Sequence, residues 1–152
     1  MVEAPNPLVI AKSIYAAWQT SSSKGIFHGR ISPAVILCGE SEAVLIGAGM
    51  DLVVPVSELD STATACLGEN QFFGRTSTLR CDHYSLLRVI EFMIDYKAPS
   101  DTQPATFTRS TCEDTLSGEA QYALSSWLND DTPSRYATAS ETLMTVFGDP
   151  TK

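Results

Sequence analysis

Positive charge is scarce in this sequence of 152 residues. Ten Lys and Arg residues stand against eighteen Asp and Glu residues, which gives a formal net charge of −8. Binding to nucleic acid or to an anionic membrane requires a cationic surface, so we expect neither. An acidic chain of this kind is expected to be soluble, or to meet a partner with a basic surface.

Closely spaced cysteines and long apolar runs are also missing. Cys38, Cys66, Cys81 and Cys112 lie far apart and form no Cys-x-x-Cys pair. Only Cys81 and His83 are as close as structural zinc ligands usually are, so we expect no metal and no cofactor. No apolar run approaches the ~20 residues that span a bilayer. The N-terminal residues include one acidic side chain, Glu3, and no basic cluster, so they do not resemble a secretory signal. We therefore expect a cytoplasmic location and reduced cysteines.

The composition is that of a globular protein. Hydrophobic residues make up 43% of the chain and charged residues 18%, which argues against intrinsic disorder. The length is close to the commonest size of a single domain. Because no repeat or low-complexity linker divides the sequence, we expect one globular domain over residues 1–152.

Four segments have the apolar spacing of helices. The first begins where Asn6 can cap a helix and Pro7 suits its first turn. Asp82 is placed to cap another helix. Thr132 can cap a further one, since a proline follows it as Pro7 follows Asn6. We expect helices at about 7–20, 83–96, 115–128 and 133–147.

Two apolar runs predict a β-hairpin at about 34–47. Residues 34–38 and 43–47 flank the polar turn Gly39–Glu42. Their continuous apolar character indicates burial on both faces, and therefore a central place in the sheet. With other short apolar runs, such as Leu52–Val56, we expect a small, mostly antiparallel sheet of 3–5 strands. Since strands and helices cluster separately, the predicted class is α+β.

The best candidate for chemistry is the sequence Cys81-Asp82-His83. A cysteine nucleophile needs a nearby base, and histidine is the usual one. A helix N-terminus also stabilises a thiolate. The structural interpretation is a half-buried Cys81, a helix cap at Asp82 and an exposed His83 in the first turn. Because catalytic partners normally come from distant segments, we favour this second interpretation and assign no catalytic residue.

The predicted helix 83–96 has apolar residues around nearly its whole circumference. A helix of that kind is buried in a core or shared with a partner. Aromatic and methionine side chains are enriched at interface centres. Tyr84, Phe92, Met93 and Tyr96 are therefore the candidate interface residues.

These features favour a non-catalytic protein-binding module, such as an inhibitor, an immunity-type protein, an adaptor or a subunit of a larger assembly. Its partner would be another protein, or further copies of the same chain. One alternative is a small cysteine/histidine enzyme that uses Cys81 and His83. The other is a structural subunit of a particle or filament. Within the binding-module hypothesis, nothing in the sequence chooses among an inhibitor, an immunity-type protein, an adaptor and a subunit.

Overall fold

The fold is known from a computed structural model. It describes residues 7–25, 27–38, 43–47, 56–59, 61–67, 79–94, 117–130, 132 and 134–148. The elements are α1 (Pro7–Ser22), η1 (Pro33–Val35), β1 (Ile36–Cys38), β2 (Ala43–Leu45), η3 (Val56–Glu58), α2 (Ser61–Ala65), α4 (Leu79–Ile94), α6 (Gly118–Asn129) and α7 (Ser134–Phe147). Helices therefore dominate, and the described strands form one small antiparallel sheet.

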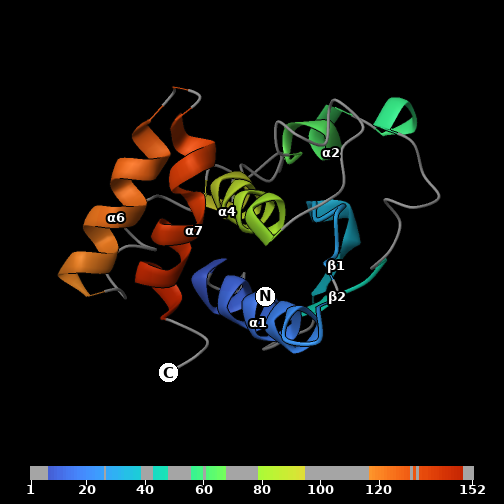
Figure 1. The fold of residues 1–152 in the computed structure, drawn as a ribbon, viewed down its shortest axis with the longest axis horizontal. Helices are drawn as coiled ribbons and strands as arrows, with labels where there is room; N and C mark the ends of the chain where they lie inside the picture. The colour runs from blue at the N-terminus through green and yellow to red at the C-terminus, as the bar shows by residue number, and fades with distance from the viewer. Residues whose placement is uncertain are drawn as a thin grey trace, which may run out of the picture.

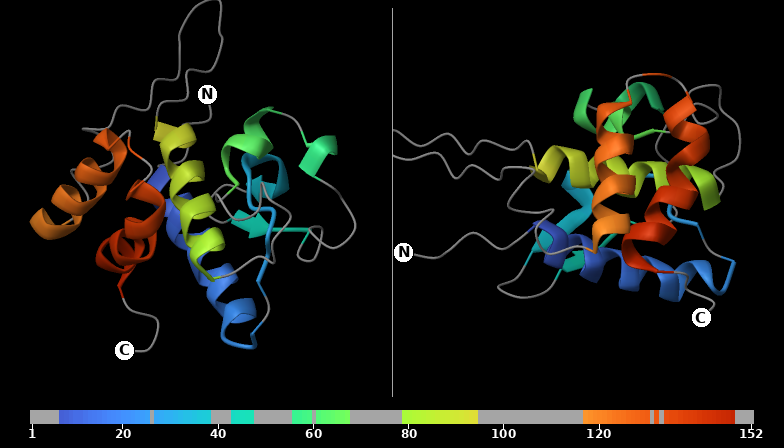
Figure 2. Two further views of the ribbon diagram at one scale, coloured as in Figure 1. Left: turned by 45° about the horizontal axis from the view of Figure 1, so that its top comes forward. Right: turned by 90° about the vertical axis from the view of Figure 1, so that its left-hand side faces the viewer.

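The elements pack in a row across the molecule. Figure 1 shows α6 and α7 at one end, α1 and α4 in the middle, and the hairpin and α2 at the other end. The left-hand view in Figure 2 keeps this order, and the right-hand view looks along the row from the end at which α6 and α7 lie. Each neighbour contacts the next: α6 packs on α7, α7 on α4, α4 on α1, and α1 on β2. The helix pair α1 and α4 is consequently covered on one side by helices and on the other by strands.

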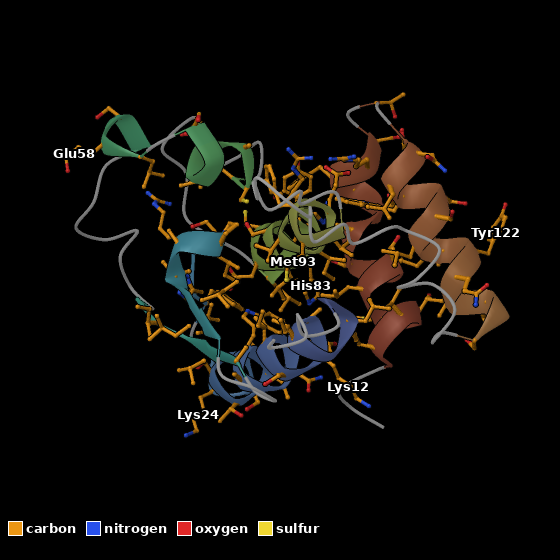
Figure 3. The ribbon with its side chains drawn as sticks, turned by 180° about the vertical axis from the view of Figure 1, so that it is seen from behind. Lys12, Lys24, Glu58, His83, Met93 and Tyr122 are labelled. Atoms are coloured by element: carbon orange, nitrogen blue, oxygen red, sulfur yellow. The ribbon has the colours of Figure 1, made fainter. Side chains whose placement is uncertain are left out.

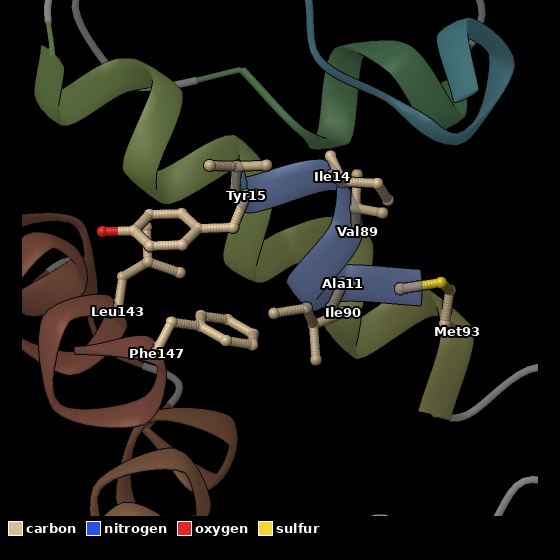
Figure 4. A pocket seen from close by; sticks show the side chains of 9 residues that line it. Ala11, Ile14, Tyr15, Val89, Ile90, Met93, Leu143 and Phe147 are labelled. Carbon is tan, nitrogen blue, oxygen red and sulfur yellow. The ribbon is translucent and has the colours of Figure 1, made fainter. Parts of the chain in front are cut away.

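The predicted first helix is confirmed. Ile14, Tyr15 and Trp18 are buried along one side of α1, whereas Lys12 and Thr20 on the opposite side are exposed. This apolar side meets α4 and α7 at a junction of aliphatic and aromatic side chains (Figure 4). The Tyr15 ring stacks on Trp18 at 5.8 Å between centroids. The helical spacing in the sequence therefore indicated the correct buried face.

The buried helix α4 begins earlier than the sequence predicted. It begins at Leu79 instead of residue 83, so Asp82 lies inside the first turn and does not cap the helix. The Asp82 side chain is fully buried and accepts hydrogen bonds from outside α4. The described part of the helix ends at Ile94, so residues 95–96 of the prediction lie outside the described residues.

The two C-terminal helices are confirmed with small shifts at their ends. Ser117 caps α6, because its hydroxyl accepts a hydrogen bond from the Ala120 amide at 3.3 Å. Helix α7 ends at Phe147, and the following Gly148 has a φ of 88°, a conformation that glycine adopts easily. The Gly148 amide donates to the Met144 carbonyl at 2.7 Å. Residues 115–116, where the sequence placed the start of the first of these helices, lie outside the described residues.

The predicted hairpin is also confirmed. Strands β1 and β2 pair antiparallel, with Leu37 opposite Val44. The sheet of 3–5 strands is more than the described residues contain, since they form two strands. Val56, expected in a further strand, belongs to the 3₁₀ turn η3, and residues 52–55 lie outside the described residues.

The hairpin does not occupy the central, doubly buried position that the sequence predicted. Its inner face lies on α1, where Ser13 donates to the Ala43 carbonyl at 3.3 Å and accepts from the Ala43 amide at 3.1 Å. Its outer face is open, and Leu37, Val44 and Ile46 are 55%, 52% and 43% exposed. The prediction of burial on both faces was wrong, because α1 packs on one face whereas these side chains of the other face are exposed. None of the helices within the described ranges has the length and hydrophobicity needed to cross a membrane.

Candidate functional site

Cys81 and His83 lie near the start of α4 but do not form a pair. Positions two apart on a helix do not face each other. The Cys81 sulfur lies 3.2 Å from the Tyr136 hydroxyl, and the His83 Nδ1 lies 2.7 Å from the Ser140 hydroxyl, both on α7. The nucleophile–base contact that the enzyme hypothesis requires is therefore not formed.

The structural interpretation of Cys81, Asp82 and His83 is also wrong in detail. Cys81 was expected to be half-buried and His83 to be exposed, but they are 0% and 1% exposed. The reason is that α7 packs across the start of α4 and covers both side chains. A reagent in solution therefore has no open approach to the Cys81 sulfur.

His83 is held neutral by its surroundings. Burial lowers the pKa of His83 to about 4, because the charged imidazolium loses its hydration. The Trp18 indole lies against the ring, with 4.8 Å between centroids in an edge-on arrangement. A side chain with that pKa is uncharged at neutral pH and links α4 to α7 through Ser140.

The Asp82 carboxylate joins three segments of the chain. Its Oδ2 accepts hydrogen bonds from the Trp18 indole at 2.8 Å and the His28 amide at 2.7 Å. Its Oδ1 accepts from the Gly29 amide at 2.9 Å. Burial raises the pKa of Asp82, and these hydrogen bonds oppose that rise because they favour the ionised form. The carboxylate thus fastens α1 and the following loop to α4.

His28 extends this buried network toward the hairpin. The Arg30 amide donates to His28 Nδ1 at 3.1 Å, so the ring proton is on Nε2. His28 Nε2 therefore donates a hydrogen bond to the Ile46 carbonyl oxygen at 2.6 Å. Asp82 and His28 together tie the end of β2 to the helical core. Sequence reasoning missed this network; the one available signal was Trp18, since a buried indole N–H needs an acceptor.

Tyr84, the first interface candidate, already has aromatic neighbours within the chain. Its ring meets Trp127 of α6 edge-on with 6.0 Å between centroids, and Tyr136 of α7 with 5.4 Å. The side chain is half-buried. Its packing against α6 and α7 accounts for an aromatic residue at this position.

Phe92 and Met93 are half-buried further along α4. The Arg88 guanidinium lies over the Phe92 ring at 5.1 Å from its centroid. Met93 lies at the junction of α1, α4 and α7 (Figure 4). Tyr96 lies outside the described residues. A role in partner binding for these candidates stays a prediction.

The outer face of the hairpin exposes aliphatic side chains to solvent. Leu37 and Val44 face each other across the strands, and Ile46 lies two residues beyond Val44 on the same side. A solvated sheet face normally carries polar side chains. Three aliphatic side chains instead form this surface, which we call the hairpin face: Leu37, Val44 and Ile46.

The described residues contain no group of three or more His, Cys, Asp and Glu side chains placed to hold a metal ion. Comparison of the chain with protein-family models, with curated proteins and with solved structures found no match. Function is therefore inferred from the surfaces of the molecule itself.

Proposed function

We propose that this chain is a non-catalytic protein-binding module that contacts its partner through the hairpin face. The supporting observation is that Leu37, Val44 and Ile46 are about half exposed on one side of the sheet, in which the described residues form two strands. A sheet of two strands is only marginally stable by itself. Covering these side chains with a partner removes apolar surface from water, which drives association.

The partner that fits best is a different protein with an apolar centre surrounded by basic residues. The net charge of −8 makes two copies of this chain repel each other, whereas it attracts a cationic partner and speeds the encounter. The connection between the two strands carries Glu40 and Glu42 in its sequence and no basic residue.

The test uses the full chain and a variant of the hairpin face. The tagged protein captures its partner from the source cells, and the purified partner is then titrated calorimetrically against wild type and Val44→Lys. A charge in the centre of the contact should weaken binding by about tenfold or more. Leu79→Lys is the matched control, because Leu79 is an aliphatic residue with 41% exposure outside the hairpin. It should bind like wild type.

Three results would overturn the proposal. In the first, Val44→Lys and Leu79→Lys have the same affinity as wild type, so that the contact lies elsewhere. In the second, light scattering shows a homodimer that Val44→Lys dissociates, so that the occupant of the hairpin face is a second copy. In the third, the wild-type protein is a strict monomer and captures no partner.

A further inference from the structure

Two side chains from outside the hairpin form hydrogen bonds with β2 and with the residue that follows it. Ser13 on α1 contacts Ala43, and His28 in the loop after α1 contacts Ile46. In the sequence these contacts lie on either side of Val44, which belongs to the hairpin face. Figure 3 shows the hairpin beside α1, on the opposite side of the molecule from α6. We call Ser13 and His28 the hairpin anchors.

The Ser13 hydroxyl binds both backbone groups of Ala43. The Ile46 amide donates to the Val35 carbonyl at 2.9 Å, and hydrogen-bonded pairs alternate along an antiparallel ladder. The amide and carbonyl of Ala43 therefore point away from β1. Ser13 accepts from that amide at 3.1 Å and donates to that carbonyl at 3.3 Å. The hydroxyl thus occupies the place that a neighbouring strand would take at this edge of the sheet.

His28 supplies the donor for the Ile46 carbonyl. The Val35 amide, which lies opposite this carbonyl in the ladder, donates instead to the Ser32 carbonyl at 3.1 Å. His28 Nε2 takes its place, at 2.6 Å from the Ile46 oxygen. The ring is 3% exposed, and its Nδ1 accepts from the Arg30 amide at 3.1 Å. Both ring nitrogens are therefore bonded, and the ring is fixed in the orientation that reaches β2.

We propose that Ser13 and His28 are positioning residues for the hairpin face, which hold the hairpin in its binding conformation without touching the partner. The inference rests on the proposed function, because it concerns the affinity of that same surface. A two-stranded sheet is only marginally stable by itself. Without the anchors the hairpin opens more often, and Leu37, Val44 and Ile46 then no longer share one side. A partner that binds only the anchored hairpin has an apparent Kd equal to its intrinsic Kd divided by the anchored fraction.

Hydrogen exchange of the chain alone tests the anchors without a partner. Ser13→Ala removes two hydrogen bonds and should raise the exchange rate of amides in β1 and β2 by about tenfold. Amides of α4 should change by less than about twofold, because the opening is local. Ser22→Ala is the matched control, since Ser22 is also half-buried on α1 but its hydroxyl donates to the Gln19 carbonyl at 3.3 Å. It should leave hairpin exchange as in wild type.

Two substitutions at His28 separate its hydrogen bond from the packing of its ring. His28→Gln keeps an N–H donor near the place of Nε2, whereas His28→Leu has none. Both keep the backbone amide, which donates to Asp82 of α4 at 2.7 Å. Hairpin exchange should rise about tenfold in His28→Leu and return to within about twofold of wild type in His28→Gln. A positioning role predicts this rescue by the donor, and a packing role does not.

The partner captured by the tagged wild-type chain then tests the effect on affinity. With a hairpin that is open in about 10% of wild-type molecules, tenfold more opening leaves about half of them anchored, and hundredfold more leaves about a tenth. Calorimetry should therefore give a Kd about twofold higher in Ser13→Ala and about tenfold higher in the double variant Ser13→Ala with His28→Leu. Ser22→Ala should bind like wild type.

Faster hairpin exchange with an unchanged Kd in the double variant would overturn the proposal, because anchoring would then not matter for binding. Unchanged hairpin exchange in both Ser13→Ala and His28→Leu would overturn it too. So would equally faster exchange in α4, which would assign the anchors a role in global stability alone. Failure of the proposed function looks different: Val44→Lys then binds like wild type, whereas exchange in the chain alone still responds to the anchors.

Discussion

His83 should make the fold sensitive to mild acid. Its pKa is about 4 in the folded chain against an ordinary value of 6.5. The unfolded chain therefore takes up a proton first as the pH falls below 6.5, and the folded chain follows only near pH 4. The neutral, buried His83 therefore contributes to the free energy of unfolding, and this contribution is fully present above pH 6.5. By linkage, about 2 kcal/mol of it is lost at pH 5 and about 3 kcal/mol below pH 4.

The assay compares wild type with His83→Asn in urea at pH 7.5 and pH 5.0. Asparagine does not titrate, and its amide can keep the hydrogen bond to Ser140. Fluorescence of the two buried tryptophans, Trp18 and Trp127, reports unfolding. Wild type should lose about 2 kcal/mol more than the variant between these pH values. Asp82 changes the pH dependence of stability in the opposite direction, since its raised pKa favours the folded chain at low pH. Because Asp82 is present in both proteins, its effect cancels in the comparison. Equal losses in the two proteins would refute the account of His83.

Two further predictions concern the start of α4. Asp82→Asn replaces one oxygen of the carboxylate by an NH₂ group that cannot accept from Trp18, His28 or Gly29. It should reduce the free energy of unfolding by about 1–3 kcal/mol, measured by urea titration at pH 7.5, and unchanged stability would contradict the role of this carboxylate. Cys81 is 0% exposed, so iodoacetamide should label it only after unfolding, as judged by mass spectrometry. Labelling of the native protein at the rate of a free thiol would show that the sulfur is accessible.

Local signals predicted the helices well, because their causes lie within each segment. Ile14 and Trp18 repeat at helical spacing, and the glycine after residue 147 ends α7. The hairpin was predicted for the same reason, since two apolar runs flank a polar turn. The exposure of the outer face of the hairpin was not predicted, because the same apolar run suits a doubly buried strand and a strand with one exposed apolar face.

The surroundings of the candidate site depend on contacts between distant segments. Asp82 next to a helix start suits a cap, and only the approach of Trp18 and the His28 amide shows that it is a buried acceptor. His83 was expected in solvent because its covering residue, Ser140, is 57 positions away. Such contacts leave no periodic pattern in a single sequence.

The role of the hairpin face is tested most directly by hydrogen exchange of the chain alone and with its captured partner. The account predicts slower exchange on binding in peptides that cover residues 33–47, where Leu37, Val44 and Ile46 lie. Peptides from α6 and α7 should exchange at unchanged rates. Protection confined to α6 and α7, with none at the hairpin, would contradict the account.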